Sequence, residues 1–183
     1  NNILPPPTEV TLPPQSSDVL ILTILKDNTS FGSKRTIKNY IHLIKSFSYN
    51  PKKISVGMLI SDQNTYDEVQ AYWKKSSNLN YFNQIKIFHK LCEGDNSIGR
   101  SDRLRHAPSI QKKRRSLLAR YRNLLLSLTL GNIGMDVDNI LWIDADMAMI
   151  PSNIIETFQK TQKKIVTVQY VKNNIILHTF HIQ

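Results

Sequence analysis

The stretch VLILTIL, Val19–Leu25, is apolar except for one threonine. A half-buried strand alternates polar and apolar residues, whereas a strand covered on both faces reads as a continuous apolar run. We therefore expect a buried strand of a parallel sheet here. ISVGMLI, Ile54–Ile60, and NILWI, Asn139–Ile143, are two more strand candidates, and QIKIF, Gln84–Phe88, is a shorter one.

Helical patterns separate these strands. Helices are expected over Thr36–Phe47, around Val69–Trp73, over Lys113–Leu130 with a stop at Gly131, and from Pro151 onward. Residues 94–108 are polar and indicate a loop. Two further strands are expected at Ile165–Val171 and Ile175–Ile182, joined by a tight turn at Asn173-Asn174. Strands that alternate with helices predict an α/β fold with a mostly parallel sheet.

Length and composition indicate one folded domain. The 183 residues are 40% hydrophobic, which excludes a collagenous or wholly disordered chain. Residues 1–17 contain five of the eight prolines and are expected to form an extended stem or linker, so that residues 18–183 form the domain. The chain starts without Met, and we expect it to be part of a longer protein. Cys92 is the single cysteine, so no internal disulfide is expected.

Positive charge is concentrated in one segment. The net charge is +10, and Arg100–Arg122 contributes nine basic residues against one acidic residue. Such a segment suits the phosphates of a nucleic acid, the diphosphate of a small ligand, or a solvated helix face. Tyr121 is the one aromatic residue within it, which argues against binding of a nucleic-acid single strand. No nucleic-acid partner is expected.

Carboxylates follow several of the expected strands. Lys26-Asp27, Asp62 and Asp144-Ala145-Asp146 each come directly after one. Open α/β sheets bind ligands beyond the carboxyl ends of their strands. Alternate residues of an extended segment share a face, so Asp144 and Asp146 could approach one Mg²⁺ or Mn²⁺ ion together. The alternative is a solvated turn with capping aspartates.

Other motifs are weaker. The five histidines show no metal-ligand spacing, and no general base partners Cys92. Asn28-Thr29-Ser30 is a sequon for N-glycosylation that follows the first strand and could face the cleft.

Two strings together indicate a family. RHAPSIQKKRRSLLARYRNLLL, Arg105–Leu126, and the later LWIDAD resemble the fungal Golgi α-mannosyltransferases of glycosyltransferase family 62, the mannan polymerase subunits. VLILTILKD and LISD are similar to that family in the same order, and the resemblance covers about residues 18–171. It implies a GT-A fold, GDP-mannose as donor, Mn²⁺ as metal, and retaining transfer that forms an α-1,6 or α-1,2 bond.

The resemblance also implies roles for single residues. Asp144 and Asp146 match the metal and donor motif, and Arg122 would stabilise the charge that develops on GDP, so these three are the expected catalytic residues. The further expected donor contacts are Thr23, Lys26, Asp27, Asp62, Arg114, Arg115, Arg120 and Asn123. No protein base is assigned, because the leaving phosphate could take the acceptor's proton.

The resemblance has limits. Ile24 replaces a proline that is usual in the family, and the distal part with the acceptor groove and a further metal-site histidine is absent; His178 and His181 come too early to match it. Family members are type II Golgi membrane proteins that act on a mannan or N-glycan acceptor alongside sister subunits. The alternatives are a truncated, non-catalytic subunit of a mannosyltransferase complex and, more remotely, a nucleic-acid binding module.

Overall fold

The computed structural model describes residues 17–75, 78, 80–91, 108–133, 137–171 and 174–180, and for residues 108–109, 133, 165–171 and 174–180 it describes the backbone. The predicted stem before residue 17, the polar stretch up to residue 107, Cys92 and His181 lie outside these residues. Among the described residues, no helix combines the length and the hydropathy that a membrane span requires.

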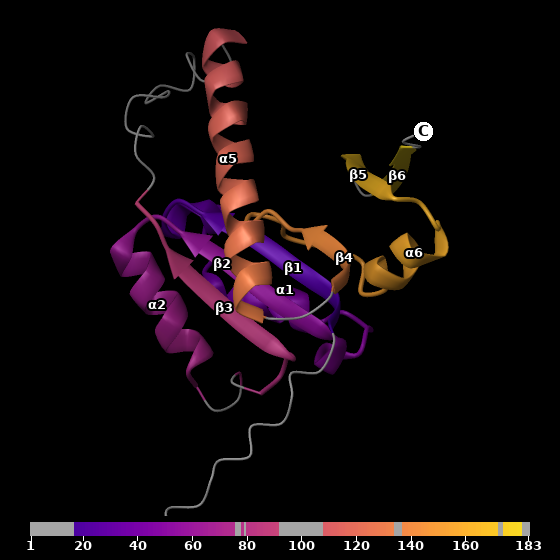
Figure 1. Cartoon of the computed structure of the whole chain (residues 1–183), viewed down its shortest axis with the longest axis horizontal. Coiled ribbons are helices and arrows are strands. Elements are labelled where there is room, and N and C mark those ends of the chain that lie inside the picture. The colour runs from indigo at the N-terminus through magenta and orange to yellow at the C-terminus, as the bar shows by residue number, and fades with distance from the viewer. Residues whose placement is uncertain are drawn as a thin grey trace, which may run out of the picture.

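A parallel sheet lies at the centre of the described residues (Figure 1). Its strand order is β3-β2-β1-β4. The strands are β1 (Ser17–Leu25), β2 (Ile54–Ile60), β3 (Gln84–His89) and β4 (Val137–Trp142). β1 pairs in parallel with β2 on one side and with β4 on the other. The predicted α/β class with a parallel sheet is confirmed in a Rossmann-like form, and the narrower GT-A assignment stays a prediction.

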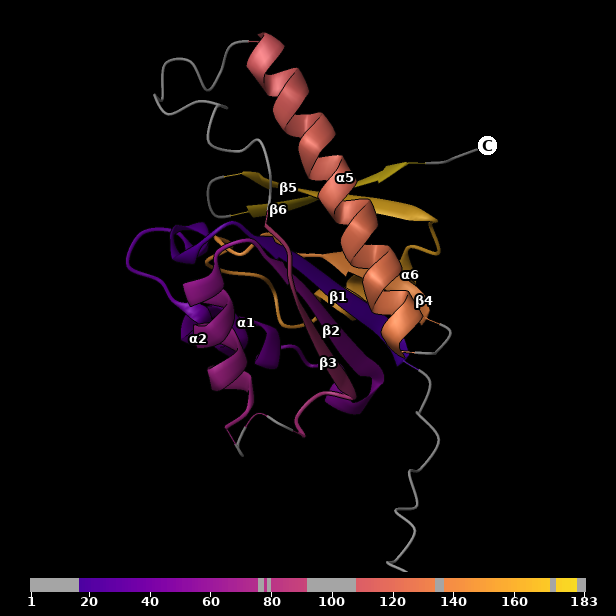
Figure 2. The same cartoon turned by 60° about the vertical axis from the view of Figure 1, so that its left-hand side comes forward.

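Helices cover both faces of the sheet (Figure 2). On one face lie α1 (Ile37–Lys45), α2 (Gln63–Trp73) and α6 (Ile154–Lys160), and on the other lies α5 (Pro108–Ile133). Short 3-10 helices, η1 (Asn28–Phe31) and η2 (Pro51–Lys53), follow β1 and precede β2. Successive residues of β1 join different cores, Ile21 the α1 side and Leu22 the α5 side, which explains the continuous apolar run.

The first predicted helix is confirmed, and its expected apolar stripe is buried. Ile37, Tyr40, Ile41 and Ile44 of α1 are each at most 2% exposed. α2 confirms the helix expected around Val69.

α5 packs on the sheet through its C-terminal half. A Cβ atom on Gly57 of β2 would lie 2.6 Å from Thr129 Oγ1 and 2.7 Å from Leu22 Cδ2, so glycine permits this close approach. The N-terminal half projects away from the sheet (Figure 1), and Leu118 is 41% exposed there. The predicted stop at Gly131 was wrong. α5 continues to Ile133, because a glycine inside a helix costs only about 1 kcal/mol.

Two other predicted boundaries were wrong by a few residues. α6 begins at Ile154 rather than at Pro151, because the carbonyl of Ser152 accepts hydrogen bonds from Ser48 N and Oγ, at 2.9 and 3.1 Å. The C-terminal hairpin is confirmed as β5 (Ile165–Val171) and β6 (Asn174–Phe180), which are antiparallel. Asn174 was expected in the turn but pairs with Val171 as the first residue of β6.

Candidate functional site

The strand order reverses between β1 and β4, and the region beyond the carboxyl ends of these two strands is here called the β1–β4 crevice. From β1 the chain runs outward through α1, β2 and α2 to β3, and α5 on the opposite face then returns it to β4 on the other side of β1. Open α/β sheets bind ligands beyond the carboxyl ends of their strands, at the point where the strand order reverses. Ile143 N donates to Leu22 O at 3.1 Å and keeps the two strands paired up to the crevice.

Asp144-Ala145-Asp146 forms a turn directly after β4. Met147 N donates to Asp144 O at 3.2 Å, so the segment is not an extension of the strand. Ala145 is 3% exposed and points into the core, whereas Asp144 and Asp146 are exposed. Both carboxylates are exposed on a turn rather than on an extended strand, so the strand alternation expected for them is absent, and their joint binding of a metal ion stays a prediction.

The loop after β1 meets this turn. Asp27 caps η1, with Oδ1 accepting from Thr29 N at 2.9 Å, and Gly32 ends η1 with φ of 85°, which glycine adopts without strain. A Cβ on Gly32 would lie 3.5 Å from the Cβ of Asp146. Arg35 Nη1 donates to the main-chain oxygen of Asp146 at 2.8 Å. The two sides of the crevice are therefore held together.

Thr23 lies beneath the turn, in the core. It is 1% exposed, and its Oγ1 donates to Ile143 O at 2.9 Å. That bond uses the one hydroxyl hydrogen of Thr23, so the hydroxyl of Tyr40 donates to Thr23 Oγ1. Burial, and then the charge of Asp144, raise the pKa of Tyr40 above its usual range. The expected nucleotide contact by Thr23 stays a prediction; in the structure its hydroxyl fixes the end of β4.

Arg122 of α5 reaches a carboxylate of the turn. Its Nη2 lies 3.5 Å from Asp144 Oδ1, and its Cζ lies 5.4 Å from the centre of the Trp142 ring. The two charged side chains are 39% and 74% exposed, so their ion pair contributes at most about 1 kcal/mol. A partner with more charge, such as a diphosphate or a divalent cation, can replace it at little cost.

A pocket of about 340 Å³ lies beside this ion pair, between α5 and Trp142. It is lined by Arg115, Leu118, Ala119, Arg122, Asn123, Leu126 and Trp142. Three of the predicted donor residues, Arg115, Arg122 and Asn123, therefore come together. Arg120 lies about 200° around α5 from Arg122 and points elsewhere, and Arg114 is not part of the lining.

The remaining predicted residues lie nearer β2. Asp62 caps α2, because Oδ2 accepts from Thr65 N and Oγ1, each at 2.8 Å. These hydrogen bonds lower the pKa of Asp62 below its usual range. Asp62 N donates to the main-chain oxygen of Lys26 at 2.9 Å, so Lys26 and Asp62 lie together. The strand order places this group on the opposite side of β1 from the Asp144 turn.

The chain is similar in sequence to known proteins of one family. A profile of the Anp1 family matches residues 8–179. This chain belongs to the Anp1 family. It is 27% identical over 154 residues to the mannan polymerase complex subunit MNN9 of Candida albicans, covering 82% of the chain and 39% of the relative. It is 26% identical over 156 residues to mnn9 of Schizosaccharomyces pombe, covering 81% and 42%. The Anp1-family chain thus spans about two fifths of the length of these curated relatives. The predicted family is confirmed, and it is a glycosyltransferase-related one.

The acidic turn of this Anp1-family chain can supply part of a metal site. Among the described residues, no group of three or more His, Cys, Asp and Glu side chains could hold an ion. Mg²⁺ and Mn²⁺ prefer oxygen ligands, and Mg²⁺ commonly uses one or two carboxylates together with substrate phosphates and water. The exposed carboxylates of Asp144 and Asp146 fit that pattern.

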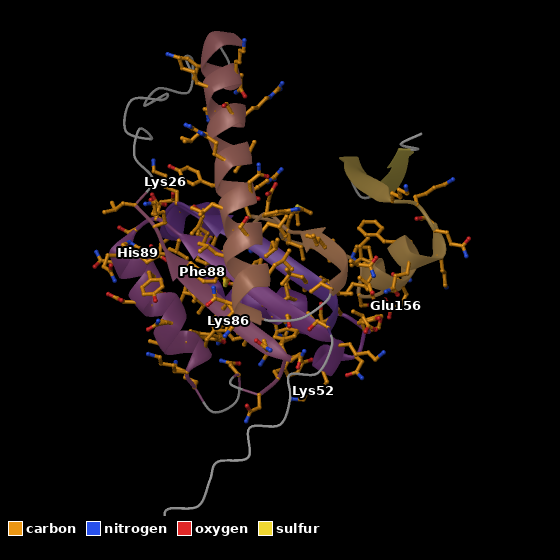
Figure 3. All side chains as sticks on the ribbon, viewed as in Figure 1. Lys26, Lys52, Lys86, Phe88, His89 and Glu156 are labelled. Carbon is orange, nitrogen blue, oxygen red and sulfur yellow. The ribbon has the colours of Figure 1, made fainter. Side chains whose placement is uncertain are left out.

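Two residues near the carboxyl-terminal ends of the strands of the Anp1-family chain were missed from sequence. His89 ends β3, its Nε2 lies 3.1 Å from Ser61 O, and its ring centre lies 5.4 Å from that of Tyr66. Figure 3 shows His89 and Lys26 at the same end of the sheet. The strand-end rule could have found His89, which directly follows QIKIF. Arg35 comes ten residues after β1, and no pattern singles it out.

Proposed function

We propose that this Anp1-family chain contains the donor-binding part of a retaining α-mannosyltransferase that uses GDP-mannose and a divalent cation, Mn²⁺ or Mg²⁺. The observation that carries the proposal is the exposed Asp144-Ala145-Asp146 turn at the β1–β4 crevice, with Arg122 3.5 Å from Asp144. Family membership supports the same activity class. The acceptor would be a mannan or an N-glycan.

The acidic and the basic residues of the site would bind different parts of the donor complex. Asp144 and Asp146 would hold the cation, which when bound supplies Lewis-acid stabilisation of the diphosphate. Arg122 and Arg115 line the same pocket, and each guanidinium can donate two hydrogen bonds to phosphate oxygens. They would stabilise the negative charge that develops on GDP as the bond to mannose breaks. Asn123, beside Arg122, would orient the donor.

The acceptor hydroxyl would attack on the face of the sugar that the diphosphate leaves. The departing phosphate oxygen takes the proton of that hydroxyl, so no protein base is required. This scheme keeps the configuration at the anomeric carbon.

The names of the two relatives support partner subunits and a cellular location for this chain. Both are named as mannan polymerase complex subunits, which supports assembly of this chain with sister mannosyltransferase subunits in the Golgi. Because the chain corresponds to about two fifths of each relative, a subunit role without its own catalysis is the second candidate. Transfer of mannose from GDP-mannose by this chain alone would exclude that candidate.

Calorimetric titration of GDP in the presence of MnCl₂ tests donor binding. We expect Asp144→Ala and Asp146→Ala to weaken binding at least 10-fold. Asp138→Ala is the matched control, since this exposed aspartate of β4 lies six residues, or about 20 Å, from Asp144 and should bind normally. Unchanged GDP affinity in both turn variants would refute the proposed site. A labelled oligonucleotide tests the alternative of nucleic-acid binding. If GDP displaces the oligonucleotide, both bind the same basic residues, which supports a donor site rather than a nucleic-acid binding module.

A further inference from the structure

The sequon Asn28-Thr29-Ser30 lies in η1, and it is the one Asn-x-Ser/Thr sequence of the 183 residues. Asn28 and Thr29 are exposed. We propose that Asn28 carries an N-linked glycan that extends over the face of α2 that carries Glu68, away from the β1–β4 crevice. This inference rests on the lumenal location that belongs to the proposed function.

The side chain of Asn28 points toward α2. Its Nδ2 donates to Oε2 of Glu68, an exposed residue of α2, at 2.8 Å. α2 follows β2, and β2 lies on the opposite side of β1 from β4. Later in the same loop, Arg35 donates a hydrogen bond to Asp146 instead, and a Cβ on Gly32 would lie 3.5 Å from that of Asp146. The loop therefore has one side toward α2 and another toward the crevice, and Asn28 belongs to the first.

Capping of η1 accounts for the residue types on either side of Asn28 but does not require an asparagine at position 28. Asp27 accepts from Thr29, and Ser30 Oγ accepts from the main-chain N–H groups of Lys26 and Asp27, at 3.0 and 3.3 Å. These bonds stabilise η1. They make no use of the Asn28 amide side chain, which is exposed and donates a hydrogen bond to Glu68.

Attachment of a sugar is compatible with that contact. In oligosaccharyl transfer the amide nitrogen forms a bond to C1 of a lipid-pyrophosphate-linked oligosaccharide. The bond from C1 to the pyrophosphate oxygen breaks, the lipid pyrophosphate leaves, and the amide loses one proton. The substituted Nδ2 keeps one hydrogen, which is enough for the bond to Glu68, and the sugar takes the other position.

The occupancy test uses the full chain, expressed behind a cleavable secretory leader in a eukaryotic host. Treatment with peptide:N-glycosidase F should lower the mass of the secreted protein by one glycan. The shift should persist in Thr29→Ala, which keeps the sequon, and disappear in Asn28→Gln and in Ser30→Ala. Asn28→Gln retains the η1 cap, so it reports on the glycan even if Ser30→Ala folds poorly. A folded, secreted wild type without a mass shift overturns the proposal.

Hydroxyl-radical footprinting tests the direction of the glycan. Tyr72 lies four residues after Glu68, on the same face of α2, and Met149, which is 70% exposed, lies three residues after Asp146. Labelling of Tyr72 should fall at least 2-fold in the glycosylated protein relative to the enzymatically deglycosylated one, with labelling of Met149 unchanged. Protection of Met149 instead would place the glycan over the crevice and contradict the proposal. Neither measurement depends on GDP binding, so failure of the donor site would be seen separately.

Discussion

Arg35 donates a hydrogen bond of 2.8 Å to the main-chain oxygen of Asp146, a residue 111 positions later in the chain. The bond spans the crevice, because Arg35 belongs to the segment after β1 and Asp146 to the turn after β4. It uses a backbone acceptor, and so leaves the carboxylate of Asp146 for a ligand. Arg35 therefore positions the acidic turn without neutralising it.

Replacement of Arg35 should loosen the acidic turn more than it destabilises the protein. For Arg35→Ala we expect GDP affinity in MnCl₂ to fall about 3- to 10-fold, and the free energy of unfolding to fall by only about 1 kcal/mol. Calorimetry and urea unfolding measure the two effects. Lys38→Ala removes the same charge from an exposed position of α1 and serves as the control. Equal binding by both variants would contradict a positioning role.

Substitutions of the buried residues Thr23 and Tyr40 should lower the free energy of unfolding by different amounts. Thr23→Val keeps the shape but leaves both the Ile143 carbonyl and the Tyr40 hydroxyl without their partner, at about 1–3 kcal/mol for each buried group. Tyr40→Phe removes one donor and leaves the Thr23–Ile143 bond intact, so it should cost about 1 kcal/mol. Urea unfolding of the two variants compares them. A larger loss in Tyr40→Phe would refute this hydrogen-bond assignment.

Two arginines of α5 should differ in their effect on donor binding. Arg122 lines the pocket and lies 3.5 Å from Asp144, whereas Arg120 faces another direction. A hydrogen bond to a charged group contributes about 1.5–3 kcal/mol, so Arg122→Ala should weaken GDP binding by roughly 10- to 100-fold. Arg120→Ala removes the same charge from the same helix and should change affinity less than about 2-fold. The reverse order would show that the helix face is assigned wrongly.

Gly57 controls how closely α5 packs. The added Cβ of Gly57→Ala would lie 2.6 Å from Thr129 Oγ1, so α5 must shift or the core must strain. We expect a loss of about 1–3 kcal/mol in the free energy of unfolding. The double variant Gly57→Ala, Thr129→Ala removes both crowding atoms of Thr129, Oγ1 at 2.6 Å and Cγ2 at 2.9 Å, and should recover part of this loss. Gly131→Ala, where nothing lies within 4 Å, should be neutral or stabilising.

The cap of α2 should make stability depend on pH. Hydrogen bonds from Thr65 lower the folded-state pKa of Asp62 below its unfolded value of about 4. A lowered folded-state pKa stabilises the protein above the unfolded pKa, and this contribution is lost as the pH falls through the folded pKa. Asp62→Asn keeps a capping oxygen that does not titrate. The stability advantage of the wild type over Asp62→Asn should therefore be present at pH 6 and shrink below pH 4, as measured by thermal unfolding.

The fold was predictable because each helix and strand is indicated by the hydrophobic pattern of its own segment. β1 and β2 are continuous apolar runs, and they are buried on both faces as such runs require. The strand-end rule also located Asp144 and Asp146, since it needs only the end of an apolar strand. The hairpin and α1 followed from simple periodicity.

The rest of the site depends on packing between distant segments. The helical spacing of α5 is visible in the sequence, but the side that faces Trp142 is decided by the fit of Thr129 against Gly57. Arg115 and Arg122 are thereby selected over Arg120. Thr23 looked available at a strand end, yet its side chain alternates with Leu22 toward α1 and reaches Tyr40. Arg35 has no local signal, because its acceptor is a backbone atom of another segment.

The pairing of β1 with β4 also determines the order in which the strands of the sheet can fold together. Partners such as Thr23 and Ile143 are 120 positions apart, whereas β1, β2 and β3 pair with their neighbours in sequence order. Closing so long a loop is slower and loses more chain entropy than the local pairings. During synthesis β1, β2 and β3 can thus assemble before β4 emerges. The acidic turn takes its place in the last step, so capture of a nucleotide would report that folding of the sheet is finished.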